Sequence, residues 1–576
     1  MRWTRPGYAL VLALLVVGPL LAPGYLLVRD AVSTPRSYLS DTALGLTSAP
    51  RATPQDFAVA LASRLVDGGV VVKALLLLGL WLAGWGAARL VAVALPCAGI
   101  SGEFVATTVA IWNPYVAERL LQGHWSLLVG YGCLPWVAAA MLTLRTARTG
   151  RFAVGGLVFW IALAGLTPTG LLLAATVALV CLAAPVKGTA GCWPRRWCAA
   201  AALGAAVVAA LPWLVASAMG SSLTTHTAAN RLGVDAFAPR AEPGLGTLAS
   251  LAGLGGIWNG EAVPGSRTTL FAVCSTVALL AVVAAGLPTV LRRPAAVPLL
   301  ALAAVAVLVP AALATGSGLQ LLRTVVDAVP GFGVLRDGQK WVALAMPGYA
   351  LAGAGAVVTV RRWLRIPGTA PALVCCLALL LALPDLAWGV FGRVAPVHYP
   401  RGWTAVAAAI NADPGAVAVL PAGTMRLFSW SGPTPVLDPL PRWVRARVLS
   451  TGDLVISGTT IAGEGVHARA VQELLLSGPD PAALAAAGVA WLVVESDSAG
   501  GMGAAARTLS ALAPVYRDGE MALYRVGGQT PGVSAVRRAA TMAAHLVWLA
   551  VLIGGGAGAL IGGAWRHRRR SAPSGD

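Results

Sequence analysis

Charged side chains are scarce in this sequence. Asp, Glu, Lys and Arg make up 11% of its 576 residues, whereas about a quarter of the residues are charged in soluble proteins. Hydrophobic residues reach 57% and the mean hydropathy is +0.75, which excludes an ordinary soluble chain. Apolar runs of about twenty residues, each long enough to cross a bilayer, recur along most of the sequence. The composition therefore indicates a polytopic membrane protein.

Among the charged residues the acidic ones are the fewer, with 23 Asp and Glu against 42 Lys and Arg. In a soluble protein this excess would suggest nucleic acid or an acidic partner. Here eighteen of the basic residues lie in short segments between or beyond the apolar runs, for example Arg145, Arg292 and Arg361. With the N-terminus inside, all these segments lie on the inner side, as the positive-inside rule expects. The charge thus predicts a multi-pass plasma-membrane protein with both termini cytoplasmic, and it excludes nucleic acid as the expected partner.

Cysteine and histidine are few and scattered. The eight cysteines lie within apolar runs or on the inner side, so no disulfide framework is predicted. The six histidines show no spacing typical of metal ligands. The sequence therefore predicts no metal site and leaves any cofactor unknown.

The apolar runs predict about twelve membrane spans, and the fold class is a mostly α, polytopic helical membrane protein. The first run is too long for a signal peptide and no cleavage site follows, so it predicts an uncleaved first helix. The predicted spans cover residues 7–27, 70–95, 102–116, 124–143, 153–169, 171–186, 197–219, 269–291, 295–316, 341–360, 369–390 and 540–564.

One long polar segment interrupts the spans near the C-terminus. Between Arg393 and Arg525 it contains ten basic and ten acidic residues, as an ordinary soluble unit would. Helical and strand patterns alternate in it, which predicts a small extracytoplasmic α/β domain before the last span. The predicted organisation is a membrane domain over 1–390, the α/β domain over 391–538, and the last span with a basic cytoplasmic tail over 539–576. The expected elements are helices at 402–412, 465–477, 481–487 and 504–512 and strands at 416–420, 490–495 and 521–526.

The first outer loop, residues 28–69, is rich in aspartate for so apolar a chain. Asp30 directly follows the first span, and Asp41 comes later in the loop. The run from Thr53 to Asp56 has the pattern of a helix start, with an N-cap, a proline and an acidic first turn. Apolar residues then recur at every fourth position, which predicts an amphipathic helix on the outer membrane surface.

Two further outer segments carry charges at the depth of the bilayer surface. The stretch 112–125 contains Glu118, Arg119 and His124 between aromatic residues typical of an interfacial belt. The stretch 332–341 contains Arg336 and Lys340, whose spacing of four would place them on one helix face where they could neutralise a lipid phosphate. Solvation among headgroups and snorkelling are the simpler alternatives for these charges.

These segments together resemble the GT-C class of membrane glycosyltransferases. Asn-Pro-Tyr-Val-Ala-Glu-Arg at 113–119, with Gly123, Trp125 and Leu-Pro-Trp at 134–136, is similar to the N-terminal membrane part of actinobacterial arabinofuranosyltransferases. Arg-Asp-Gly-Gln-Lys-Trp at 336–341 is similar to a later outer loop of related proteins. The resemblance covers roughly the first 390 residues.

The resemblance implies a glycosyltransferase that acts on the outer face. It implies a polyprenyl-phosphate sugar as donor and a cell-envelope glycan or glycolipid as acceptor, both met in a membrane-lipid environment. The base of such enzymes is an acidic residue of the first outer loop, which here is Asp30, with Asp41 as the second choice. Arg119, Arg336 and Lys340 would stabilise the departing lipid phosphate, and Glu118 and His124 join them as candidate substrate-binding residues.

A non-catalytic role is the alternative. The first loop carries single, well separated aspartates where the GT-C class often has an acidic pair. An envelope-assembly scaffold or a lipid-glycan transporter would have no need of such a pair. Polar residues at midplane, which a transporter is expected to have, are almost absent, so the scaffold is the stronger of these two alternatives.

Overall fold

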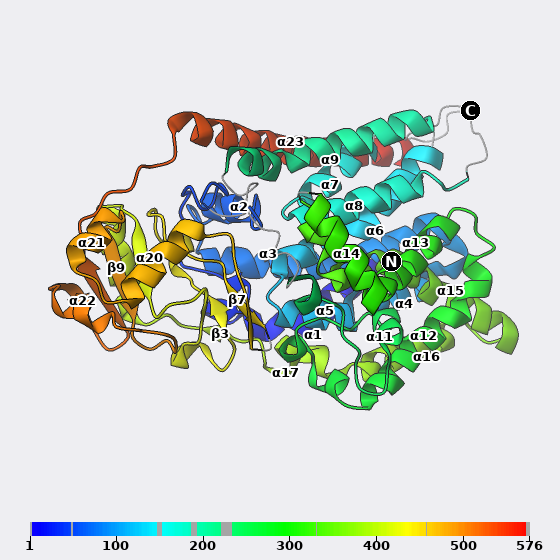
Figure 1. Ribbon diagram of the computed structural model, residues 1–576. Helices are drawn as coiled ribbons and strands as arrows, with labels where there is room; N and C mark the ends of the chain where they lie inside the picture. Colours follow the sequence, from blue (N-terminus) through cyan, green and yellow to red (C-terminus); the bar gives the residue numbers. More distant parts are fainter. Residues whose placement is uncertain are drawn as a thin grey trace.

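The computed structural model describes residues 3–47, 50–146, 153–185, 193–220, 233–329, 331–456 and 458–571. In these ranges a large helical part lies beside a smaller part that contains the main sheet, and the C-terminal helix returns from the smaller part along the helical one (Figure 1). The helices of the large part are α1 (Thr4–Val17), α2 (Gln55–Ala62), α3 (Gly68–Ala94), α4 (Gly99–Ile111), α5 (Pro114–Leu121), α6 (Trp125–Thr146), α7 (Ala153–Ala164), α8 (Pro168–Cys181), α9 (Arg195–Met219), α11 (Thr247–Ala252), α12 (Phe271–Val290), α13 (Val297–Leu313), α14 (Gly316–Ala328), α15 (Met346–Leu364), α16 (Thr369–Ala382), α17 (Ala387–Phe391) and α23 (Ala535–Ser571).

Seven helices of the described residues are long and apolar enough to cross a membrane, and up to nine spans result if each of two bent helix pairs counts as one. The prediction of a polytopic helical protein is confirmed, but the number of twelve is not. The predicted span 102–116 divides into α4 and the short α5, which begins at Pro114. Among the described residues α7 and α8 have only 12 and 14 residues. Hydropathy registers apolar content, whereas proline and glycine decide where a helix ends.

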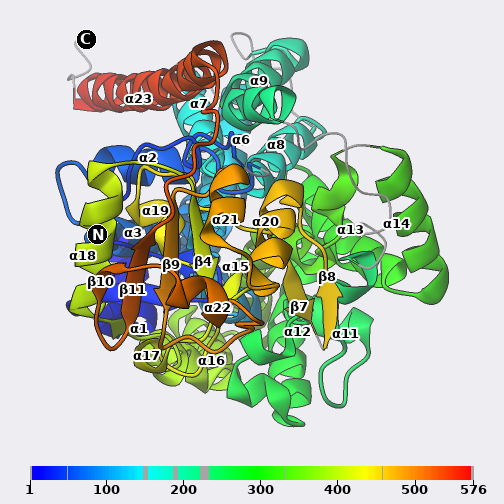
Figure 2. The ribbon, with the colours of Figure 1, turned by 60° about the vertical axis from the view of Figure 1, so that its left-hand side comes forward.

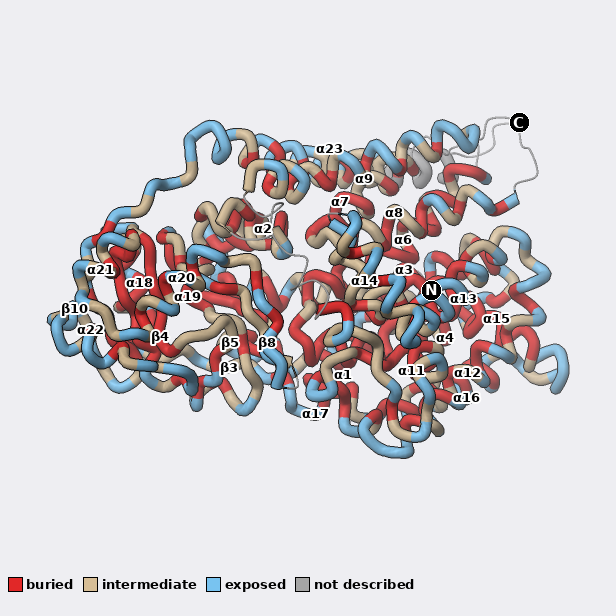
Figure 3. The backbone as a smooth tube through the Cα atoms, viewed as in Figure 1, coloured by how far each residue is buried: buried red, intermediate tan, exposed pale blue. Residues whose placement is uncertain are grey.

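The centre of the helical part is formed by α6, which packs against α3, α7 and α8. The contact between α3 and α6 is close because glycines face each other there. A Cβ on Gly132 would collide with the carbonyl oxygen of Gly79. Apolar side chains remain exposed on the outer helices, among them Val207 of α9 and Ile553 of α23, and Figure 3 shows this contrast between buried centre and exposed rim. Such a rim is suited to contact with lipid.

The smaller part is built around a four-stranded sheet in the order β10-β11-β9-β4. The edge strand β4 is parallel to its neighbour β9, while β9–β11 and β11–β10 are antiparallel. Its strands and helices are α18 (Arg401–Ala412), β4 (Val417–Leu420), α20 (Val466–Leu476), α21 (Pro481–Ala486), β9 (Trp491–Glu495), α22 (Ala506–Ser510), β10 (Pro514–Arg517) and β11 (Met521–Arg525), accompanied by α19 (Leu440–Trp443) and the short strands β5 (Met425–Arg426), β6 (Val436–Leu437), β7 (Leu454–Ile456) and β8 (Thr459–Ile461).

Helices cover both faces of this sheet (Figure 2). Alternate residues of a strand point to opposite faces, and here Val417 and Val419 of β4 pack with α18, whereas Ala418 and Leu420 pack with α20 and α21. Because both faces are buried, β4 and β9 are continuously apolar up to Glu495, the last residue of β9. All seven elements predicted for this segment are present. The limits of the domain and its position outside the membrane stay predictions.

The first loop is tied to the smaller part by a second sheet. β1 (Tyr25–Val28) pairs with β2 (Ala31–Val32) on one side and with β3 (Pro396–Val397) on the other, both antiparallel. Sequence patterns did not predict these short strands. The predicted surface helix is α2, but it begins at Gln55, one residue after the proline. Its Phe57 is fully buried against the ring of His545 in α23, 4.6 Å between ring centroids, so protein rather than lipid covers this part of its apolar face.

Candidate active site

The short helix α5 carries two of the predicted site residues into the protein interior. Asn113 caps it, because its side chain accepts a hydrogen bond from the Val116 amide at 3.1 Å, and Pro114 occupies the first helical position. Every residue of α5 is buried. Glu118 and Arg119 are therefore not surface charges among headgroups but parts of an internal network.

Arg119 forms the centre of this network. Its guanidinium group is 0% exposed and binds Asp337 in a bidentate manner, with Nη1–Oδ2 at 2.8 Å and Nη2–Oδ1 at 3.0 Å. Nη2 also donates to the Gln339 side chain, and Lys340 Nζ lies 3.6 Å from Asp337 Oδ2. Burial acts to raise the pKa of Asp337, but the charges of Arg119 and Lys340 lower it more, so this pKa lies well below its ordinary value. Asp337 is a carboxylate at neutral pH.

His124 connects Arg119 to Asp30. Arg119 Nη1 lies 3.2 Å from His124 Nδ1, and His124 Nε2 lies 2.8 Å from Asp30 Oδ2. A guanidinium group can only donate, so Nδ1 is the acceptor and Nε2 carries the proton toward Asp30. Burial lowers the pKa of His124 more than the hydrogen bond to Asp30 raises it. The neutral imidazole therefore has one defined tautomer.

Asp30 is the exposed end of the chain of contacts. It lies in the turn between β1 and β2, where the preceding residue Arg29 has a φ of +46°, a strained value for a residue with a side chain. Gln122 Nε2 lies 3.2 Å from Asp30 Oδ2, and 37% of the Asp30 side chain is accessible. Burial raises the pKa of Asp30, but the hydrogen bonds from His124 and Gln122 lower it more. Asp30 is thus an oriented, accessible carboxylate.

Gly123 makes the approach of His124 to the β1–β2 turn possible. Its φ is +81°, and a Cβ at this position would collide with the backbone of Ala31 and Val28. A left-handed conformation at this close approach favours glycine. The glycine of the sequence motif therefore has a direct role in assembling the site.

Glu118 shares the Gln339 side chain with Arg119 and also binds the segment around residue 256. Its carboxyl oxygens accept from the amides of Gly256 and Ile257, each at 3.2 Å, and from Gln339 Nε2 at 2.9 Å. Burial and the negative charge of Glu242 hold the pKa of Glu118 well above its ordinary value. Glu118 thus fixes the loop around residue 256 to α5, and its side chain is fully buried.

Asp41 and Arg336 have other partners. Asp41 binds Arg538 of α23 in a bidentate manner, with both distances 2.7 Å. Arg336 stacks over the Phe237 ring at 5.6 Å and donates to the Gly333 carbonyl at 3.1 Å. The segment is not one α-helix, because two 3-10 helices, Phe332–Leu335 and Gly338–Ala345, are separated by Arg336 and Asp337. The expected single helix face with Arg336 and Lys340 is therefore corrected.

Asp337, Gln339 and Gln122 are site residues that the sequence reasoning did not single out. Asp337 and Gln339 lie between Arg336 and Lys340 in the quoted motif, and Gln122 lies in the first motif. Both motifs could have indicated them, since a buried arginine needs a carboxylate partner. Within the described ranges, no group of three or more His, Cys, Asp or Glu side chains is arranged to hold a metal ion.

The arrangement combines an accessible carboxylate, a neutral histidine and a cation. The first candidate span ends at Leu21 and β1 follows it, so Asp30 does not directly follow the first membrane helix as expected. Of the cations, Lys340 is 27% exposed and can meet a ligand, whereas Arg119 is enclosed. In general an accessible carboxylate can accept a proton from a hydroxyl group, and a nearby cation can stabilise an anion.

Comparison with solved structures shows which proteins share this fold. The cryo-EM structure of arabinofuranosyltransferase AftD from Mycobacteria matches 92% of the chain with a TM-score of 0.61 and 18% identity. A mutant form of the same protein matches 92% with a TM-score of 0.55 and 19% identity. The chain spans 40% and 42% of the length of these two structures. The resemblance to arabinofuranosyltransferases is confirmed at the level of the fold. No protein-family model and no curated protein matches the chain.

Proposed function

We propose that this protein is a membrane glycosyltransferase that transfers a sugar from a polyprenyl-phosphate donor to a cell-envelope glycan or glycolipid. The observation that carries the proposal is the accessible Asp30 carboxylate, which His124 hydrogen-bonds in the turn after β1, the strand that follows the first membrane helix. The fold shared with AftD supports it, because 92% of the chain takes part in that similarity. Arabinofuranose is the sugar to test first.

In the proposed reaction Asp30 accepts the proton of an acceptor hydroxyl group. The acceptor oxygen forms a bond to the anomeric carbon of the donor sugar, and the bond between that carbon and the phosphate oxygen breaks. Polyprenyl phosphate leaves with the electron pair, and Lys340 stabilises its negative charge. Asp30 must be ionised before the reaction, which agrees with its lowered pKa.

Arg119, Asp337 and His124 have a positioning role in this proposal. The bidentate Arg119–Asp337 pair holds the guanidinium group at His124 Nδ1, which leaves Nε2–H directed at Asp30. A base held in one orientation loses less entropy in the transition state than a freely rotating one. We place the reaction on the outer face of the plasma membrane, with both termini cytoplasmic, because the basic loops favour that orientation.

The test is sugar transfer by membranes that contain the intact chain. Membranes with Asp30→Asn and Asp41→Asn variants, matched for protein abundance, receive labelled polyprenyl-phosphoryl arabinofuranose and, in parallel, other polyprenyl-phosphate sugars. Loss of a general base lowers the rate by about 10²–10⁴-fold, and we expect this for Asp30→Asn. Asp41→Asn is the matched control, because its carboxylate pairs with Arg538. Equal rates of sugar transfer by both variants would exclude Asp30 as the base. If the folded protein transfers sugar from none of the donors, a scaffold role is favoured.

A further inference from the structure

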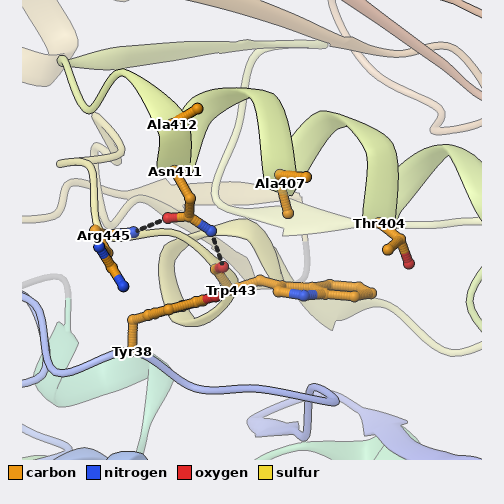
Figure 4. Close-up of a pocket in the computed structure, with 8 residues that line it drawn as sticks. Tyr38, Thr404, Ala407, Asn411, Ala412, Trp443 and Arg445 are labelled. Atoms are coloured by element: carbon orange, nitrogen blue, oxygen red, sulfur yellow. Dashed lines mark hydrogen bonds between the residues drawn. The ribbon is translucent and has the colours of Figure 1, made fainter.

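A groove of about 360 Å³ lies between α18 and the segment around Tyr38 (Figure 4). None of the residues that line it takes part in the hydrogen bonds of the Asp30 network. This volume is within the range of small-ligand sites. The groove is lined by Tyr38, Thr404, Ala407, Ala408, Asn411, Ala412, Trp443 and Arg445.

One wall of the groove is the outward face of α18. This helix is amphipathic, and Trp403 and Ile410 are buried in the core of the smaller part. The groove side carries short residues instead, and Thr404, Ala408 and Ala412 are exposed. Small side chains along three turns leave room for an elongated ligand.

The other wall is aromatic and basic. Arg445 lies over the Tyr38 ring at 5.1 Å from its centroid, and Trp443 continues the floor beside Tyr38 (Figure 4). Asn411 joins the two walls, because its Nδ2 donates to the Trp443 carbonyl at 3.2 Å and its Oδ1 accepts from the Arg445 amide at 2.7 Å. The groove is therefore preformed.

Its chemistry is that of a sugar-binding surface. The half-buried Tyr38 presents an apolar ring together with a hydroxyl group, which matches sugars, whose rings have apolar C–H faces and hydroxyl edges. Trp443 also lines the groove, but only 5% of it is exposed. The Thr404 and Tyr38 hydroxyl groups and the Arg445 guanidinium group supply hydrogen-bonding partners at the rim. No carboxylate lines the groove.

The backbone connects the groove to Asp30. The Arg29 amide donates to the Pro435 carbonyl at 2.9 Å, and the Tyr38 amide donates to the Arg442 carbonyl at 3.1 Å. Residues 29–38 therefore accompany residues 435–442, with Asp30 near one end and the groove at the other. Tyr38 is eight positions after Asp30, so their Cα atoms are at most about 28 Å apart. A glycan of several sugars can span this distance.

We propose that this groove binds the glycan chain of the acceptor, several sugars away from the sugar to which the new one is added. This proposal rests on the proposed function of Asp30. Such a subsite would let the enzyme distinguish long acceptors from short ones. It would strengthen the binding of long acceptors and so lower their KM. The rate of the chemical step would stay unchanged.

The test fills the groove in the full-length protein in detergent or nanodiscs. Ala408→Trp adds bulk inside the groove, and Ala506→Trp adds the same bulk to an exposed position of α22, outside it. Binding of a hexa-arabinofuranoside is measured by calorimetry. We expect Ala408→Trp to raise the Kd about tenfold or more, equivalent to ~1.4 kcal/mol, and Ala506→Trp to leave it unchanged. Arg445→Ala, compared with the exposed Arg507→Ala, gives a second pair should Ala408→Trp unfold the protein.

The outcomes separate the groove from the active site. If Asp30→Asn abolishes transfer while binding still depends on Ala408 and Arg445, both proposals stand. If binding depends on these residues but no variant or wild-type protein transfers sugar, the groove stands as a glycan site and the proposed enzyme activity is overturned. Equal Kd values for all four variants and the wild type overturn the groove, whatever the transfer assay gives.

Discussion

Two buried arginines, one in each part of the molecule, are held in similar ways but end in different surroundings. In the helical part Arg119 binds Asp337, and in the α/β unit Arg426 binds Glu495 at the end of β9 and lies 3.6 Å from Asp438. Both guanidinium groups are almost completely enclosed. From Arg119 the hydrogen bonds continue through His124 to the accessible Asp30, whereas Arg426 and Glu495 remain inside the protein.

The electrostatics of the two carboxylates differ accordingly. Burial and the charge of Asp438 hold the pKa of Glu495 well above its ordinary value, against the opposing charge of Arg426. Asp337 has two cations beside it, and its pKa is lowered. Of these two buried pairs, Arg119–Asp337 is the one that hydrogen bonds connect to an accessible carboxylate. The Arg426 cluster is a structural connection between β5 and β9.

The largest expected effect comes from removing each arginine. Removal of one partner of a buried pair costs about 3–5 kcal/mol, so Arg119→Met and Arg426→Met should both lower the thermal unfolding midpoint strongly. Sugar transfer per folded molecule should fall only in Arg119→Met, because only Arg119 orients His124. A common loss of specific activity in both variants would contradict the distinction between the two clusters.

An intermediate effect is expected for His124→Phe. It removes the Nε2–H donor that helps to lower the pKa of Asp30, so that pKa rises. Because the carboxylate is the active form, transfer is lost as the pH falls through the pKa of Asp30, and the acid limb of the rate profile moves to higher pH in the variant. His124→Gln, which can still donate, should restore part of the shift. The exposed His467→Phe is the control, and an unmoved acid limb in His124→Phe would exclude this positioning role.

The smallest effect should distinguish the two cations of the segment 332–341. Lys340 faces Asp337 and is partly exposed, whereas Arg336 stacks on Phe237. We expect Lys340→Met to raise the KM for the polyprenyl-phosphate donor about tenfold, ~1.4 kcal/mol, and Arg336→Met to change it little. Steady-state kinetics with varied donor concentration measures both. A larger KM effect for Arg336→Met would assign the phosphate to the Phe237 side of the segment.

Local patterns in the sequence predicted four helices and three strands of the α/β unit, but not β10, the fourth strand of its main sheet. The strands around Val417–Leu420 and Trp491–Glu495 are continuous apolar runs, and the helix Arg401–Ala412 has an apolar stripe that ends at a polar turn. These signals extend over a few residues, so they need no knowledge of distant contacts. The short strands β1 and β3, of four and two residues, carry no such signal, because their pairing joins segments more than 360 residues apart.

The candidate site was predictable in its residue types but not in its contacts. Asp30, Arg119, His124 and Lys340 could be chosen as chemically capable residues, yet Asp41 and Arg336 qualified on the same grounds. Only the fold distinguishes these two residues from the other four, because in the folded chain Asp41 binds Arg538 and Arg336 stacks on Phe237.

The sequence by itself determined that the protein lies in a membrane, that it is mostly helical and that it has an α/β unit. Composition and periodicity act through local physical preferences, which need no distant contacts. Tertiary structure decided how many helices have the length of a span and which charges are buried. It also decided that His124 reaches Asp30, through the left-handed Gly123 and the β1–β2 turn. Hydrogen bonds between distant segments depend on geometry to within a few tenths of an ångström, and such geometry exists only in the folded chain.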